Sequence, residues 1–200
     1  PEHLTVTAFR DYLVCPYRYY LRHVLRLKGV DDSLSEMQAS QFGVLIHDAL
    51  DKLVGPMGSC TDPEQICEFL LGHLEDDVDR KFGDSPAAPL LIQIEQARMR
   101  LEAFAHKQAE RAAEGWQVRW TEQGVEGKDD LRIGKNDEFR LVGRIDRIDY
   151  HPDLKQWAIW DYKTSETAKD PVKVHWSDTK GWQDLQLPLY RHLAKWMDVH

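Results

Sequence analysis

Apolar residues recur at helical spacing through the first 115 residues of the chain. We expect a short helix capped by Thr7 and a second one opened by Pro16, because threonine caps helices and proline is tolerated in a first turn. The clearest apolar stripe lies within residues 36–53 and consists of Phe42, Leu45, Ile46, Ala49, Leu50 and Leu53.

Two longer helices complete this helical part. Thr61 begins a capped start with a proline just inside it, which predicts a helix to about Phe82. A further helix is expected from about Pro89 to Glu114, and Gly115 ends it.

The periodicity changes after Gly115. Residues 116–125, 139–150 and 156–163 are rich in aromatic and β-branched residues, and residues 151–155 form a turn signal, so an antiparallel sheet is expected. Residues 164–182 show little periodicity and predict a long loop, and a last helix is expected over 183–197. We therefore predict an α+β fold in one domain of residues 1–200, mainly helical over 1–115, with a sheet and a last helix over 116–200.

The chain is acidic overall, which argues against a polyanionic partner, but the acidic residues are concentrated in one part of the sequence. The net charge is -8, but residues 1–30 hold five Lys or Arg and two Asp or Glu, whereas residues 31–85 hold three and thirteen. Three cysteines form no CxxC pair, and no signal peptide or membrane-length apolar run is present, so we expect a cytoplasmic protein.

The turn at residues 151–155 brings two aspartates together. A hairpin folded there places Asp146 and Asp161 nearly opposite each other, about 5 Å apart at Cβ, where two carboxylates repel unless a cation or a proton separates them. Lys163 follows Asp161 by two residues and lies on the same face. Because residues 156–163 are apolar on both faces, we expect a buried central strand, on which charges are costly. A metal site and a simple ion pair explain these charges about equally well.

The same residues resemble a known signature. Gly143 and Asp146 have the spacing GxxD, and Asp161 and Lys163 have the spacing DxK, as in the paired motif of PD-(D/E)XK nucleases. The RecB-like branch, which includes helicase-nucleases and CRISPR spacer-acquisition exonucleases, has three further marks. They appear here in order, as CPxxF/Y from Cys15, GxxxH from Gly43 to His47, and QxxxY from Gln186 to Tyr190.

The resemblance implies a restriction-endonuclease-like core and a site for Mg²⁺ or Mn²⁺. Asp146, Asp161, the backbone carbonyl of Tyr162 and His47 would bind the metal ion. From helical spacing alone His47 lies off the apolar stripe, which is typical of an exposed histidine, and the motif reverses that interpretation. Lys163 would orient the attacking water and stabilise charge on the phosphate.

Further residues are candidates for substrate contacts. The resemblance puts Gln186 and Tyr190 near the scissile phosphate, although a polar cap and a half-buried tyrosine are the alternative. Glu122 occupies a place where relatives often have an acidic residue beside the metal, and an exposed strand glutamate is its alternative. Candidate DNA contacts also include Arg144 and, in the long loop, Lys173 and Trp176, whose alternative role is packing.

The resulting expectation is a metal-dependent DNA nuclease, of exonuclease type, in repair or recombination. Expected partners are DNA and a helicase or another repair subunit, with no membrane and no small-molecule cofactor. An iron–sulfur cluster, which some relatives hold with a cysteine near Cys15 and three more, is not expected in this chain. Residues for a strand after the last helix are missing, so a fragment of a longer protein is an alternative. Inactive DNA-binding or assembly modules, RNA-processing phosphodiesterases and helical interaction domains remain rival interpretations.

Overall fold

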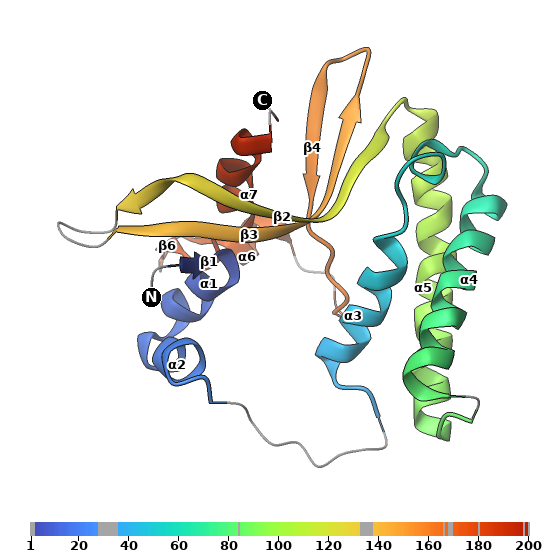
Figure 1. Ribbon diagram of the computed structural model, residues 1–200, viewed down its shortest axis with the longest axis horizontal. Coiled ribbons are helices and arrows are strands. Elements are labelled where there is room, and N and C mark those ends of the chain that lie inside the picture. The colour runs from blue at the N-terminus through green and yellow to red at the C-terminus, as the bar shows by residue number, and fades with distance from the viewer. Residues whose placement is uncertain are drawn as a thin grey trace. The chain divides into compact units, whose positions relative to one another are not determined.

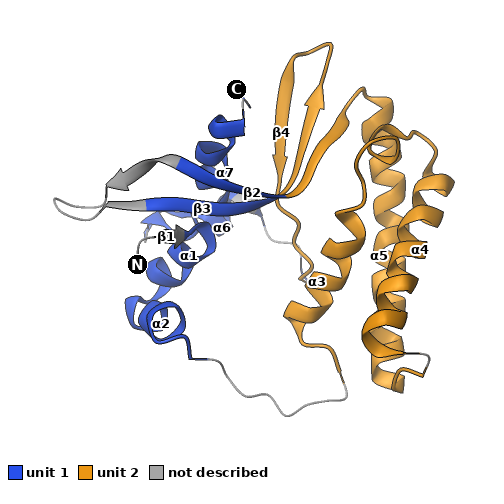
Figure 2. Cartoon of the chain, in the orientation of Figure 1, with its two compact units in different colours: residues 1–31, 123–145, 166–200 blue, residues 32–122, 146–165 orange. Residues whose placement is uncertain are grey.

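The computed structural model describes residues 3–27, 36–83, 85–132, 138–165, 167, 170–179, 181–197 and 199. The chain forms two compact units (Figure 2). Unit 1 contains residues 1–31, 123–145 and 166–200, and unit 2 contains residues 32–122 and 146–165. The division runs through two strands, after Glu122 and after Ile145, and the expectation of a single domain stays a prediction.

The first half of the chain is helical, as its apolar stripe predicts, apart from a short opening strand. In chain order the elements are β1 (His3–Thr5), α1 (Val6–Val14), α2 (Pro16–Tyr19), a π-helical turn (Tyr20–Val24), α3 (Ala39–Leu50), a 3-10 turn (Met57–Ser59), α4 (Pro63–Phe82) and α5 (Ala88–Ala113). Among the residues that the structure describes, no helix combines the length and apolarity of a membrane span.

The second half contains the long strands. Its elements are β2 (Gln117–Arg132), β3 (Glu138–His151), β4 (Gln156–Trp160), α6 (Pro171–His175), β5 (Trp176–Ser177), β6 (Gly181–Trp182), α7 (Gln186–Ala194) and a 3-10 turn (Lys195–Met197). The mixed α+β class is therefore confirmed (Figure 1).

In unit 1, strand β3 lies between β1 and β2, and β1 runs parallel to it with Leu4 opposite Leu141. Helix α7 packs closely over this strand at Gly143. A Cβ added to Gly143 would lie 2.7 Å from Leu193 Cδ1 and 2.9 Å from Val6 Cγ2. The glycine of the GxxD motif is therefore a packing requirement of unit 1.

In unit 2, helices α3, α4 and α5 share one apolar core, and α4 and α5 run side by side (Figure 1). Asp62 begins α4 by accepting hydrogen bonds from the backbone N–H groups of Glu64 and Gln65. The buried core residues are Met37, Phe42, Leu45, Ile46, Ala49, Leu50, Leu53, Ile66, Leu70, Leu74, Val78, Ala97, Leu101, Ala105 and Ala109.

The end of α5 is joined to β3 through a histidine. Gly115 ends the helix with φ +99, and a Cβ there would lie 2.8 Å from His151 Nε2. His151 donates from Nε2 to the Glu114 carbonyl over 2.8 Å and accepts the Leu154 N–H at Nδ1, so one buried ring closes the helix and shapes the β3–β4 turn.

Strand β4 pairs antiparallel with β3, with Arg147 opposite Trp160 and His151 opposite Gln156. One more pair along this register would place Asp146 opposite Asp161, as the hairpin predicts. The expectation of a central strand buried on both faces was wrong. Within the described residues β4 pairs only with β3, it ends at Trp160, and that side chain is 38% exposed.

Two other local predictions were also wrong, and one strand was missed. Thr5, not Thr7, caps α1, because Thr5 Oγ1 accepts the N–H of Ala8. The parallel strand β1 was not predicted, because three residues are too short for a periodicity signal. The expected loop at 164–182 contains α6 and a small β5–β6 hairpin, in which Trp176 faces Trp182.

The packing at Gly143 predicts a change in stability. Gly143→Ala should lower the free energy of unfolding by roughly 1–3 kcal/mol, because the new methyl group overlaps Leu193 and Val6. Gly72→Ala is the matched control. It lies in α4 with no atom within 4 Å of the new Cβ, and should raise the free energy of unfolding by roughly 0.5–1 kcal/mol. Urea titration of both variants measures this, and equal stability of the two would contradict the packing.

Candidate metal-binding active site

Helix α3 presents His47 beside its buried stripe, half-buried, with its ring edge-to-face against Tyr162 at 5.6 Å between centroids. Gly43, one turn earlier, is closely approached by the segment that follows β4. A Cβ on Gly43 would lie 3.2 Å from Thr164 Oγ1. The glycine of the GxxxH motif therefore lets this segment pass close to the helix that bears the histidine.

Strand β2 brings Glu122 to the same place. Thr121 Oγ1 donates to the Asp51 carbonyl at the end of α3 over 2.7 Å, which anchors the strand to the helix. Glu122 has φ +44, a left-handed conformation that non-glycine residues rarely adopt. Such strain persists only where the surrounding structure enforces it, and it often marks functional positions.

Strand β3 presents Asp146, which is 9% exposed. Since β4 ends at Trp160, the next position does not continue the ladder. Instead, the backbone N–H of Tyr162 donates to Asp146 Oδ2 over 2.7 Å. This hydrogen bond joins the GxxD and DxK motifs directly.

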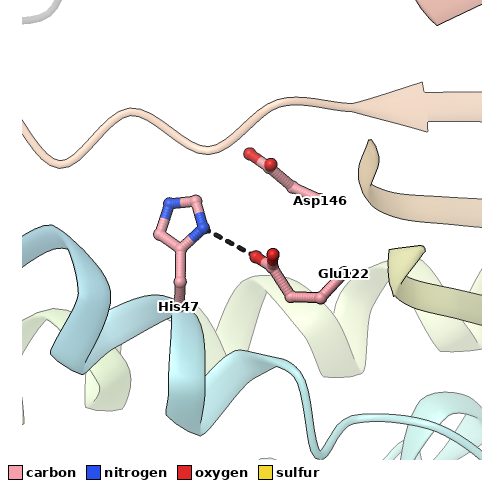
Figure 3. A group of neighbouring side chains, drawn as sticks. All are labelled: His47, Glu122 and Asp146. Carbon is pink, nitrogen blue, oxygen red and sulfur yellow. Dashed lines mark hydrogen bonds and ion pairs between the residues drawn. The ribbon is translucent and has the colours of Figure 1, made fainter. Parts of the chain in front are cut away.

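His47, Glu122 and Asp146 form one cluster, shown in Figure 3. One ligand atom from each lies within 4.8 Å of the other two. His47 Nδ1 donates to Glu122 Oε1 over 2.8 Å, which assigns the proton to Nδ1 and leaves Nε2 as the nitrogen with a lone pair. Histidines that bind metal ions commonly donate their other ring N–H to a carboxylate in this way.

Burial and neighbouring charges shift the pKa values of His47 and Asp146. The hydrogen bond to Glu122 raises the pKa of His47, and the carboxylates of Asp146 and Asp161 raise it further. Burial raises the pKa of Asp146 to about 6, and repulsion from Asp161 adds to the rise, against the opposing hydrogen bond from Tyr162. Burial and neighbouring carboxylates thus both disfavour ionised Asp146, and a bound cation would offset both effects.

Asp161 and Lys163 border the cluster on the segment after β4. The Asp161 side chain is 8% exposed and forms an ion pair with Lys163, whose side chain is 54% exposed. The sequence left a metal site and a simple ion pair as alternative explanations of these charges. The structure contains the ion pair, and beside it lies a cluster that has the donors of a metal site. The carbonyl of Tyr162 belongs to the same segment.

The remaining predicted residues belong to unit 1. Gln186 begins α7, and its Nε2 donates to the hydroxyl of Tyr190 over 3.0 Å, while Tyr190 is 3% exposed. Arg144 is exposed on β3, Lys173 is exposed on α6, and Trp176 is 42% exposed and packs edge-to-face on Trp182. Their roles in substrate binding stay predictions.

Sequence reasoning missed four residues around the site. Arg147 and Asp149 are fully buried and bonded to each other, Arg111 joins them from α5, and Arg100 donates to the Thr164 carbonyl. A usable signal existed for the first two, since opposite charges two residues apart on a strand lie on the same face and can pair.

The chain belongs to the PD-(D/E)XK nuclease superfamily, whose family model matches residues 3–198. It is also similar to a protein of Moorella thermoacetica that is named as a subunit of an ATP-dependent helicase/deoxyribonuclease, with 26% identity over 213 aligned positions. That match covers 97% of this chain but only 18% of the relative's length. The resemblance inferred from the motifs is thus confirmed, and both findings support a nuclease-type function.

The raised pKa of Asp146 predicts a stability change in metal-free protein. Its folded pKa of about 6 exceeds its ordinary value of 3.8, so ionised Asp146 destabilises the fold above pH 6. The penalty, up to about 3 kcal/mol, disappears as the pH falls from 6 toward 4. In EDTA, Asp146→Asn should therefore be more stable than wild type at pH 8 and similar to it at pH 4.

Urea titration at the two pH values measures this difference. The control is Asp153→Asn in the exposed β3–β4 turn, for which no comparable stabilisation is expected. A variant Asp146→Asn that is no more stable than wild type at pH 8 would show that the site does not hold an unfavourable negative charge.

Proposed function

We propose that this chain hydrolyses phosphodiester bonds in DNA with the help of Mg²⁺ or Mn²⁺. The observation that carries the proposal is the cluster of His47, Glu122 and Asp146, bordered by Asp161 and Lys163. Residues of the PD-(D/E)XK signature thus lie beside a donor set suited to a divalent cation.

The donor chemistry fits such an ion. Carboxylates are the usual ligands of Mg²⁺ and Mn²⁺, and a single imidazole among them suits a transition metal. We assign Asp146, Asp161, His47 and the Tyr162 carbonyl as ligands, with Glu122 holding the His47 ring through its Nδ1–H. A bound cation would also offset the burial and the repulsion that raise the pKa of Asp146.

The protein's own residues have separate tasks in this reaction. A bound divalent cation supplies charge stabilisation at the phosphate and lowers the pKa of water. Lys163 is exposed and long enough to exchange its ion pair with Asp161 for a contact to water or phosphate. Its ammonium group would then orient the attacking water and stabilise developing negative charge. We assign Gln186 and Tyr190 to the scissile phosphate or its bound water.

The proposal for the biological setting starts from the name of the relative. The relative is named as part of an ATP-dependent helicase/deoxyribonuclease, which supports DNA as the substrate and a helicase as a partner. We infer exonuclease action in repair or recombination from the resemblance of the motifs to the RecB-like branch. The rival function is an inactive nuclease-like module for DNA binding or assembly. The joint presence of His47, Asp146, Asp161 and Lys163 argues against it, because loss of cleavage removes the constraint on these residues.

Digestion of end-labelled single- and double-stranded DNA tests the proposal. Wild-type protein should cleave DNA with Mn²⁺ or Mg²⁺ and not with EDTA. Lys163→Ala should reduce the rate by roughly 10²–10³-fold, the usual effect of removing one group that stabilises transition-state charge. Lys107→Ala is the matched control, since Lys107 is an exposed lysine paired with Glu110 on α5.

Two outcomes would contradict the assignment. Cleavage that persists in Lys163→Ala at the rate of Lys107→Ala would remove the lysine from the mechanism. Binding of DNA by wild type without cleavage in either metal would favour the inactive module.

A further inference from the structure

Two of the proposed ligands, Asp161 and the Tyr162 carbonyl, belong to a segment that lies outside the strand ladder. Strand β4 ends at Trp160, and residues 161–165 have no regular secondary structure. Ladder hydrogen bonds do not hold this segment, so other contacts must fix Asp161, Tyr162 and Lys163 in place. Two arginines provide such contacts, from helix α5 and from strand β3.

Arg100 holds the far end of the segment. Its Nη1 donates to the Thr164 carbonyl over 2.6 Å, a charge-assisted hydrogen bond to a backbone acceptor. The guanidinium group also lies over the Phe42 ring, 4.9 Å from its centroid, on the same helix as His47. Arg100 therefore links α5, α3 and the segment after β4.

Arg147 holds the near end through Tyr162. Its Nη1 donates to the Tyr162 hydroxyl over 3.4 Å. Arg147 is 3% exposed and is itself fixed by Asp149, which is fully buried and accepts from its Nε over 2.5 Å and from its Nη2 over 3.0 Å. Arg111 donates to the same carboxylate over 2.7 Å, and its guanidinium group lies against the rings of Trp116 and Trp160.

The position of Tyr162 in turn affects two proposed ligands. Its N–H donates to Asp146, and its ring packs edge-to-face against His47 on one side and Phe104 on another, at centroid distances of 5.6 and 5.9 Å. A shift of Tyr162 would therefore move Asp146 and His47 together. The hydroxyl group and the ring of one residue thus connect the buried ion network to the metal site.

We propose that Arg100 and Arg147 are positioning residues that hold the segment 161–164 in the geometry required for metal binding. This inference rests on the proposed function, because it concerns the same site. Neither arginine is assigned a contact with metal or substrate. Partners in the shell behind metal ligands typically change metal affinity by about 10–100-fold when they are removed.

Calorimetric titration of the full chain with Mn²⁺ alone, without DNA, tests the inference well below the melting temperature. Arg100→Met keeps the length of the side chain and removes the charge and donors, and should weaken Mn²⁺ binding by about tenfold or more. Arg100→Lys keeps a cation that can reach the carbonyl and should recover part of the loss. Arg98→Met is the matched control on the same helix, where Arg98 pairs with Glu75, and should bind as wild type.

Tyr162→Phe tests the contact between Arg147 and the Tyr162 hydroxyl group and leaves the buried ion pair of Arg147 and Asp149 in place. It removes only the hydroxyl group and keeps the ring and the N–H to Asp146. We expect weaker Mn²⁺ binding, with a smaller loss than the roughly tenfold or more expected for Arg100→Met. The Mn²⁺ dependence of DNA cleavage should shift to higher concentration to match, so that excess Mn²⁺ restores the rate. A residue needed only for folding would change melting temperature without this shift.

The outcomes separate the inference from the proposed function. Wild-type protein that binds Mn²⁺, with Arg100→Met and Tyr162→Phe binding equally well, would overturn the positioning role and leave the nuclease assignment intact. Wild-type protein that fails to bind Mn²⁺ would overturn both. A loss in Arg100→Met that Arg100→Lys partly recovers, with Arg98→Met unchanged, supports the inference.

Discussion

In unit 2 Asp146 is buried beside His47 and Glu122, with Asp161 nearby, and the cost of burying its charge there is the constraint on which the rest of the site depends. Burial and the nearby Asp161 raise the pKa of Asp146 to about 6, and Glu122 raises that of His47. A fold that gathers like charges in a half-buried place loses stability unless a cation compensates them. Metal binding would recover the stability that is lost in the metal-free state, and this recovered free energy would contribute to the affinity proposed for the metal ion.

Several costly local features keep these groups together. Glu122 adopts a left-handed backbone conformation within a strand, and Gly43 leaves room for Thr164 against α3. Tyr162 replaces the missing ladder contact by donating its N–H to Asp146. These features involve α3, the strands β2 and β3, and the segment after β4. The site therefore depends on how these parts of unit 2 pack together.

The features of the site that follow from hydrophobic periodicity and turn signals could be predicted from the sequence. The stripe of residues 36–53 predicted α3, and the turn before Gln156 predicted a register that leads toward Asp146 and Asp161. Glu122 could only be suggested, because its contact with His47 spans 75 positions and depends on a backbone conformation that no pattern reveals. The exposure of Trp160 was missed because apolar residues on both faces of a strand do not distinguish a central strand from an edge strand. In the structure the guanidinium groups of Arg111 and Arg147 lie over the Trp160 ring, which stays partly exposed.

Anomalous X-ray diffraction from a crystal of the protein grown with Mn²⁺ would show directly whether these residues bind a divalent metal ion. We expect a manganese peak at about 2.2 Å from carboxylate oxygens of Asp146 and Asp161 and from the Nε2 atom of His47, with Nδ1 still bonded to Glu122. A fully occupied peak elsewhere, or no peak while Lys163 keeps its ion pair with Asp161, would contradict this expectation.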